Sequence, residues 1–200
     1  MADRGRATRT TLVVLVLLAA LVAAGAAGAR LLFAEVPAKA PDPVTVTCWD
    51  GEQRTDPEEC GQPTGARGLR WVFPAFRPQS EGCRDVLADF PTFQGPTMWA
   101  CEAEVSGSPV LITYSELTDL EEGLDYLEET YDDSQRTVVK APAGRPVRYE
   151  WRRPFEDGFT VISVFAEHPF AVEVRAEDEG VREEALATVR FRPPGAISYR

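Results

Sequence analysis

An uncharged, mostly apolar run near the N-terminus constrains this chain more than any other feature. Residues 10–29, TTLVVLVLLAALVAAGAAGA, contain no charged side chain, and a helix of about 20 residues spans the roughly 30 Å hydrocarbon core of a bilayer. Apolar residues continue through Phe33, so we predict one transmembrane helix over residues 10–33. The lipid bilayer is therefore the first expected partner of the chain.

The charges on either side of this run predict its orientation. Three arginines lie before it in a short basic head, residues 1–9, whereas the segment after it carries little net charge. Because positive charge collects on the cytoplasmic side, we expect the N-terminus inside the cell and the C-terminal domain outside. The alternative is a signal peptide cleaved near Ala29, which would release a secreted protein. Both alternatives export the rest of the chain.

A linker and one domain follow the apolar run. Residues 34–43, AEVPAKAPDP, are rich in proline, a composition typical of a stiff spacer. Residues 44–200 are enough for one ordinary domain with its own core. They carry 16 basic and 29 acidic side chains, a net charge of −13. Because this charge would repel phosphates, we expect no nucleic-acid partner.

Strands are predicted where apolar and polar residues alternate, and helices where apolar residues recur every three or four positions. Residues 49–68 have many turn-forming residues and no such pattern, so we expect a loop. The predicted strands are 44–48, 68–73, 98–104, 110–115, 136–140, 147–152, 159–166 and 170–175. The predicted helices are 80–89, with Ser80 as its cap, one that follows a Thr118-x-x-Glu121 capping box, and one from the cap Asp178 to about Arg190.

This order of elements predicts the fold class. Consecutive strands joined by short turns make an antiparallel sheet. We therefore predict an α+β domain, in which helices pack on an antiparallel meander sheet. The strand at 159–166 is apolar on both faces, so we expect it at the centre of that sheet.

Four cysteines in an exported domain predict two disulfide bonds. Three pairings of Cys48, Cys60, Cys83 and Cys101 are conceivable, and we favour the two local ones, Cys48–Cys60 and Cys83–Cys101. The first would close a loop that has almost no core of its own. Zinc is the alternative use of cysteines, but the chain has no C-x-x-C pair and a single histidine, so we expect disulfides.

Arginine and aromatic side chains are the residues best suited to contact a partner. Trp49 lies in a loop beside Cys48. The other three tryptophans, Trp71, Trp99 and Trp151, lie on strand patterns and are expected in the core. A group of arginines alternates with aromatic residues near position 150. A sheet with solvent-facing arginines and no binding role is the alternative. The candidates for a partner contact are Trp49, Arg148, Tyr149, Arg152 and Arg153.

No pattern in the sequence indicates catalysis, a cofactor or a metal. His168, the single histidine, lies in a predicted turn, where we expect it to be exposed, and no G-x-S-x-G context accompanies it. The acidic segments lack the calcium-loop pattern, and neither phosphate-loop motif occurs. We therefore expect a non-enzymatic domain that uses no cofactor.

The second half of the chain resembles a known family in its pattern. A Thr-capped helix leads into the meander FTVISVFAEHPFAVEVRAED, and a closing helix ends in ALATVRFRPP. Over about residues 98–194 this order is similar to the PsbP-like α/β sandwich, including exported actinobacterial proteins related to LpqN. The segments CWDG and LRWVFP also look like uncharacterised membrane-anchored ectodomains of actinobacteria. The basic residues, 19 Arg and 2 Lys, fit a high-GC bacterial genome.

This resemblance implies a PsbP-like fold and a binding or scaffolding role, and it brings no catalytic residue with it. The leading hypothesis is a membrane-anchored extracytoplasmic domain that contacts an unidentified protein or other component of the cell envelope. The alternative is a module that binds a small molecule or lipid between sheet and helices, which requires a pocket with apolar walls. An envelope hydrolase is the third hypothesis.

Overall fold

The structure is a computed structural model that describes residues 44–93, 95–140, 146–156 and 158–197. These belong to one compact unit, Val44–Arg200. The predicted head, transmembrane helix and linker all fall in residues 1–43, which lie outside the described residues. Among the described residues, no helix has the length and apolar character needed to cross a bilayer.

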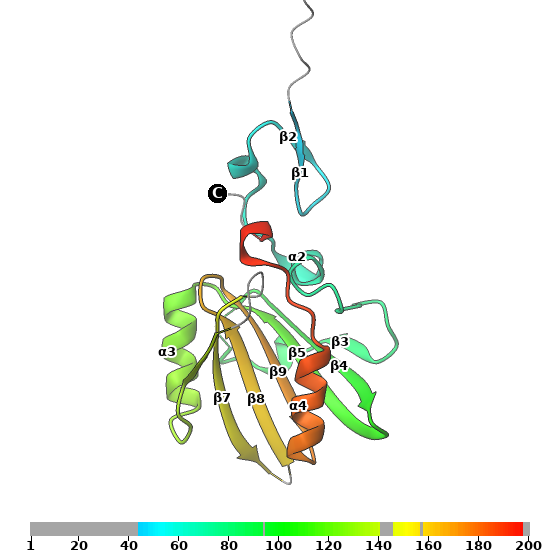
Figure 1. The fold of residues 1–200 in the computed structure, drawn as a ribbon, viewed down its shortest axis with the longest axis vertical. Helices are drawn as coiled ribbons and strands as arrows, with labels where there is room; N and C mark the ends of the chain where they lie inside the picture. The colour runs from blue at the N-terminus through cyan, green and yellow to red at the C-terminus, as the bar shows by residue number, and fades with distance from the viewer. Residues whose placement is uncertain (1–43, 94, 141–145, 157, 198–200) are drawn as a thin grey trace, which may run out of the picture. The chain divides into compact units, whose positions relative to one another are not determined.

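The domain is built on a seven-stranded antiparallel sheet (Figure 1). Two runs of consecutive strands meet in it, because β5 pairs with β9 along seven residue pairs. The α+β class and the antiparallel sheet are thus as predicted, but two meanders are joined side by side. In spatial order the strands are β3 (Cys83–Asp85), β4 (Thr97–Val105), β5 (Ser108–Glu116), β9 (Phe170–Ala176), β8 (Gly158–Phe165), β7 (Arg148–Phe155) and β6 (Thr137–Val139).

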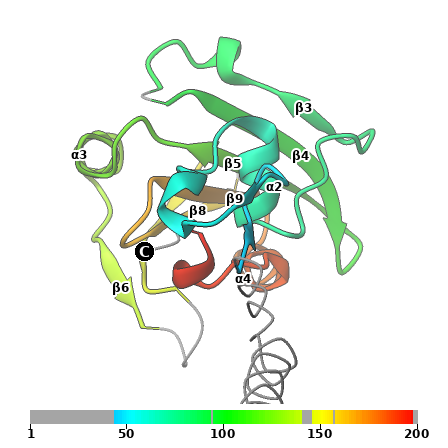
Figure 2. The same ribbon diagram turned by 90° about the horizontal axis from the view of Figure 1, so that it is seen from above.

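Helices cover both faces of this sheet (Figures 1 and 2). On one face α2 (Gly65–Val72) and α4 (Glu179–Thr188) pack on a core to which β5, β8 and β9 contribute. On the other face α3 (Leu120–Thr130) packs on a smaller cluster around Trp151. Six consecutive residues of β8 are buried, which confirms its predicted central place. Because both faces are covered, polar residues of the central strands also lie inside the protein.

Residues 68–73 belong to a helix and its C-terminal end, so the predicted strand is wrong. The amide of Gly65 donates to the Glu116 carboxylate at the end of β5, at 2.8 Å, and α2 begins there. Apolar residues at helical spacing then face the sheet, and all are buried: Leu69, Val72, Phe73 and Phe76. Aromatic and β-branched residues favour a strand by local propensity. The helix forms instead because burial of its apolar stripe against the sheet contributes more stability.

Residues 80–89 do not form the predicted short helix. Cys83–Asp85 instead makes the edge strand β3, with Cys83 opposite Cys101 of β4. A single 3₁₀ turn follows at Leu87–Asp89. Pairing with an existing strand satisfies the backbone of this segment, so its weak helical pattern has no effect.

Carboxylates begin the two longer helices. Asp119 caps α3, since its side chain accepts hydrogen bonds from the amides of Glu121 and Glu122 at 2.8 and 3.3 Å. The predicted cap, Thr118, is therefore off by one residue. Asp178 caps α4 as predicted, with the amide of Gly180 at 2.7 Å. Ionised carboxylates also interact favourably with the positive end of a helix dipole.

The first residues of the domain form a small separate hairpin. Val46–Thr47 (β1) pairs with Gln53–Arg54 (β2), and a 3₁₀ turn follows at Pro57–Cys60. The predicted structureless loop thus contains short regular elements. The disulfide Cys48–Cys60 closes this hairpin, and the indole nitrogen of Trp49 donates to the Cys60 carbonyl at 2.9 Å.

Candidate functional site

A pocket of about 330 Å³ lies between α3, the segment 86–93 and the sheet, and we call it the α3 pocket. Phe93 and Tyr126 meet edge to face at 6.3 Å between their ring centroids and join the segment to the helix. The walls are largely apolar, and they include Val86, Phe90, Phe93, Met98, Leu111 and Ile162. Its volume and walls are in the range of pockets for small organic molecules.

The floor of the α3 pocket is polar. Thr113 and Ser115 of β5 and Glu173 of β9 line it, and Thr113 lies directly opposite Glu173 in the strand register. Among the described residues, neither hydroxyl has a hydrogen-bond partner. These groups come from strands that are far apart in the sequence and become neighbours only because β5 pairs with β9.

Glu173 is the charged centre of this floor. Its Oε1 accepts hydrogen bonds from the Tyr131 hydroxyl, the Thr160 hydroxyl and Arg175 Nε, each at 3.0 Å. Its Oε2 has no partner within the described part of the chain and is not fully buried. The pocket therefore offers one carboxylate oxygen to the donor of a ligand.

Tyr131 holds that carboxylate in place. Burial raises the pKa of the Tyr131 hydroxyl, and the adjacent charge and hydrogen bond of Glu173 raise it further. The hydroxyl consequently stays protonated and donates at every physiological pH. The Arg153 guanidinium lies over the same ring, 4.3 Å from its centroid, and also donates to the Thr130 carbonyl at 3.1 Å.

The candidates predicted near position 150 are divided between the two faces of the sheet. Tyr149 and Arg153 lie on the α3 face, and Arg153 lines the α3 pocket. Arg148 and Arg152 lie on the opposite face with Glu150 and line a wider hollow of about 840 Å³ beside α4. Trp49 lies in the N-terminal hairpin. The five residues therefore do not form one surface, since neighbours on a strand point to opposite faces.

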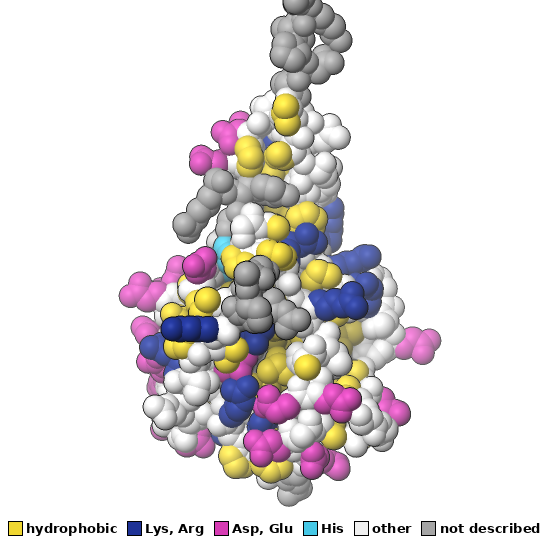
Figure 3. Space-filling view, viewed as in Figure 1, with side chains coloured by type: hydrophobic (Ala, Val, Ile, Leu, Met, Phe, Trp, Pro, Cys, Tyr) yellow, Lys and Arg dark blue, Asp and Glu magenta, His cyan; other side chains and the backbone are white. Residues whose placement is uncertain are grey.

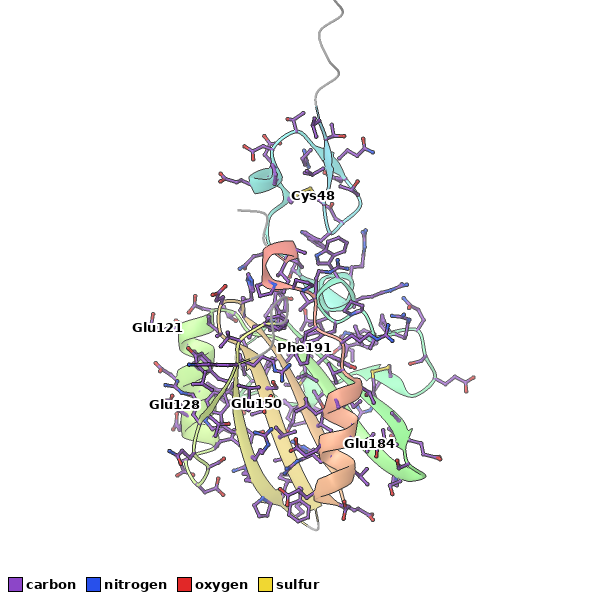
Figure 4. All side chains as sticks on the ribbon, in the orientation of Figure 1. Cys48, Glu121, Glu128, Glu150, Glu184 and Phe191 are labelled. Atoms are coloured by element: carbon purple, nitrogen blue, oxygen red, sulfur yellow. A yellow bond between two sulfur atoms is a disulfide. The ribbon has the colours of Figure 1, made fainter. Side chains whose placement is uncertain are left out.

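The alternative interpretation was a sheet whose arginines face solvent and have no role in binding. On the sheet face covered by α4, which we call the α4 face, Arg148 and Arg152 instead pair with a buried carboxylate. Glu150, which is labelled in Figure 4, is 1% exposed. It accepts hydrogen bonds from Arg148, Arg152 and the Ser163 hydroxyl. The Arg148 guanidinium also lies over the Phe191 ring, 4.4 Å from its centroid. Among the described residues, four of the five charged side chains that line this hollow thus pair with one another, and the fifth is the exposed Arg190.

Arg152 also pairs with Glu183 of α4, at 3.0 Å between Nε and Oε1. Burial by itself would lower the pKa of Arg152, but the hydrogen bonds and charges of Glu183 and Glu150 outweigh it and raise the pKa. For Glu183, burial would raise the pKa, and hydrogen bonds from Arg152 and Arg182 reverse this, so the net pKa is lowered. This network fastens α4 to β7.

The lowered pKa of Glu183 predicts a pH-dependent contribution to stability. Its ionised form stabilises the folded state above its ordinary pKa of 4.5, and this contribution is lost as the pH falls through the lower folded-state pKa. We expect Glu183→Gln to reduce the free energy of unfolding at neutral pH and to have less effect in acid. Urea unfolding at several pH values measures this difference. The same substitution at Glu184, which contacts the Ser106 hydroxyl, is the control, and an equal pH dependence there would contradict the prediction.

His168 is not in the exposed turn that the sequence predicted. It is 4% exposed, and its ring lies edge-on to Phe165 with 6.1 Å between centroids. The turn folds back on the core because Phe170, two residues later, is fully buried. Of the tryptophans expected in the core, Trp151 is fully buried, whereas Trp71 and Trp99 are half-buried at its margin.

Both disulfide bonds of the favoured pairing are present. Cys48–Cys60 closes the N-terminal hairpin, and Cys83–Cys101 joins neighbouring positions on β3 and β4. In the described part of the chain, no group of three or more His, Cys, Asp or Glu side chains is arranged to hold a metal ion.

The sequence suggested a pocket between sheet and helices only as an alternative hypothesis, and it identified none of the polar residues on the floor of the α3 pocket. A signal was present, because the polar residues Thr113, Ser115, Glu173 and Arg175 alternate with apolar residues along β5 and β9. The sequence did not indicate that β5 and β9 are neighbours in the sheet. Comparison of the chain with models of known protein families, with curated proteins and with solved structures gave no significant match. The PsbP-like assignment therefore stays a prediction.

Proposed function

We propose that this protein is an extracytoplasmic binding module whose α3 pocket holds a small amphipathic molecule. The single observation behind the proposal is a cavity of about 330 Å³ with apolar walls and an incompletely bonded carboxylate, Glu173, on its floor. The ligand has an apolar body and a hydrogen-bond donor, such as a hydroxyl or an amine. This geometry favours the small-molecule hypothesis over contact with an envelope protein.

The role we propose is binding without chemistry. Glu173 is held by three donors on one oxygen and so is positioned as an acceptor. The only histidine, His168, is buried elsewhere against Phe165. A base that acts on a substrate needs a reacting partner in the same cleft, and the described residues of this pocket supply none.

The proposal places the domain outside the cytoplasm, anchored by residues 10–33. Two disulfide bonds support this location, because such bonds persist in oxidising compartments. Protease treatment of intact cells should remove the domain and leave the N-terminal segment. A reporter that works only in the cytoplasm can be fused to the C-terminus, and activity of this fusion would contradict the proposed location. The pocket proposal would then be judged separately.

The pocket is tested with N-phenyl-1-naphthylamine, an apolar fluorescent molecule with one N–H donor. The Val44–Arg200 domain should bind it, and Met98→Trp, which fills the pocket, should weaken binding at least about tenfold, since the loss of apolar contact is worth more than 1.4 kcal/mol. Glu104→Trp places the same bulk on the same strand outside the α3 pocket, and it should bind as the wild type does.

Equal binding by the two tryptophan variants would reject the α3 pocket as the site. Failure of the wild-type domain to bind the probe, together with no small molecule in native mass spectra of protein purified from membranes, would reject the proposed function. Thermal unfolding of each variant shows whether lost binding is lost folding.

A further inference from the structure

Arginines and tryptophans gather on the exposed side of α2, where they line a hollow of about 360 Å³. In Figure 3 this is the group of dark blue side chains beside α2. The hollow shares no lining residue with the α3 pocket. We call it the α2 arginine surface, and its residues are Trp49, Arg67, Arg70, Trp71, Pro74, Arg77 and Arg192.

Three arginines of this surface, Arg67, Arg70 and Arg77, have no carboxylate partner within the described part of the chain. All three are exposed. Arg67 donates to the Asp50 carbonyl at 2.5 Å, and Arg77 donates to the carbonyls of Pro74 and Phe76. Main-chain carbonyls orient these guanidinium groups but leave their charge in place.

The sheet and α4 show the opposite arrangement. Each of their six arginines that reaches a core face or a pocket is paired with a carboxylate, namely Arg84, Arg148, Arg152, Arg153, Arg175 and Arg182. A domain with 29 acidic side chains has carboxylates in excess. The absence of carboxylates around three neighbouring arginines therefore leaves a positive region on a negative domain.

The two tryptophans present their rings with their N–H groups already bonded. Trp49 donates to the Cys60 carbonyl at 2.9 Å, and Trp71 donates to the Ala196 carbonyl at 3.2 Å. The Arg192 guanidinium lies 3.7 Å from the Trp71 ring centroid and donates to the Trp71 carbonyl at 2.6 Å. Tryptophan combined with arginine is typical of segments that lie at the headgroup level of a bilayer.

We propose that the α2 arginine surface binds the phosphate groups of anionic lipids and holds the domain against the membrane in one orientation. Arginine forms paired hydrogen bonds with phosphate oxygens, and each basic residue near an anionic surface adds to the attraction. The remaining surface is acidic and is repelled by the same lipids. Attraction on one side and repulsion on the others together select the orientation.

This inference rests on the proposed membrane tether, which also favours a lipid over a soluble anion. Trp49 lies only a few residues after Val44, where the domain begins. The linker of residues 34–43 extends at most about 35 Å, so this end of the domain stays close to the bilayer surface. The three arginines are exposed on a shallow surface, which suits a planar array of headgroups better than a single enclosed ion.

The experiment uses the full chain in lipid nanodiscs that contain brominated phosphatidylcholine, which quenches nearby tryptophan fluorescence. Quenching should increase when phosphatidylglycerol is included, because Trp49 and Trp71 then approach the bilayer. The variant Arg67→Gln/Arg70→Gln/Arg77→Gln should lose this increase. The matched control, Arg54→Gln/Arg84→Gln/Arg136→Gln, removes three exposed arginines that are paired with carboxylates, and it should keep the increase.

Three outcomes would overturn the proposal. These are equal quenching with and without phosphatidylglycerol, an unchanged increase in the first variant, and loss of the increase in both variants. Loss of the increase on adding inorganic phosphate at constant ionic strength would show that the surface prefers a soluble phosphate. Circular dichroism checks that each variant is folded. Since the two sites share no residue, probe binding to the α3 pocket is judged independently.

Discussion

Replacement of Phe73 by Ala should lower the free energy of unfolding by about 3–5 kcal/mol. Phe73 ends α2 and is 0% exposed. Its ring lies 5.2 Å from Tyr114, 5.9 Å from Phe165 and 5.7 Å from Phe191, measured between centroids. It thus joins α2, two strands and the C-terminal segment, and its removal leaves a cavity that none of them can fill alone. Domains of this size are stable by only about 5–15 kcal/mol, so the variant should be close to unfolding.

Urea unfolding of the Val44–Arg200 domain, followed by circular dichroism, measures this loss. Phe90→Ala is the control, because Phe90 is 43% exposed and its removal should cost less than about 1 kcal/mol. A similar loss in both variants would show that Phe73 has no special place in the core. The helix at 65–72 would then need another explanation than the burial of its apolar stripe.

Replacement of Glu150 by Gln should cost about 3 kcal/mol of folding free energy, since it removes one partner of a buried ion pair. The substitution preserves shape and removes only the charge. Arg148, whose side chain is 13% exposed, then loses its only carboxylate within the described residues. Arg152 retains Glu183, so the larger part of the cost arises at Arg148.

The matched control is Glu128→Gln. Glu128 pairs with Arg136 at 2.5 Å, but the two side chains are 49% and 43% exposed, and such surface pairs contribute at most about 1 kcal/mol. Chemical unfolding of both variants at neutral pH provides the comparison. If the two losses are equal, the carboxylate of Glu150 contributes no more than a surface charge, and the α4 face is not organised around it.

Predictions from local patterns were accurate where a single segment carries the information. The alternation in β4, β7 and β9 identified these strands, the turn before β5 indicated a hairpin, and the Asp178 cap located the start of α4. The favoured disulfide pairing was also present, because both bonds close short loops. In each case a segment and its near neighbours in sequence determine the outcome.

Predictions were wrong where a distant segment decides. Leu69 and its helically spaced neighbours form a helix because the sheet offers a surface on which their stripe is buried. Cys83–Asp85 is a strand because β4 offers it an edge. His168 is buried because the chain on both sides of it enters the core. The free-energy difference between helix and strand that local propensity provides is smaller than the free energy gained by burial in the tertiary structure.

The candidate sites show the same division most clearly. Alternation along β7 by itself places Arg148 and Arg152 on one face and Tyr149 and Arg153 on the other. The α3 pocket, in contrast, exists only because β9 returns to lie beside β5, which brings Thr113 opposite Glu173.

The sequence by itself indicated most strands of the sheet, the start of α4, the favoured disulfide pairing and the strong negative charge of the domain, since these depend on residues close together in the chain. Only the tertiary structure decided which strands are neighbours, which polar residues line the α3 pocket and which arginines lack a carboxylate. The reason is that burial and pairing depend on contacts between segments that are distant in sequence, and no local pattern specifies those contacts.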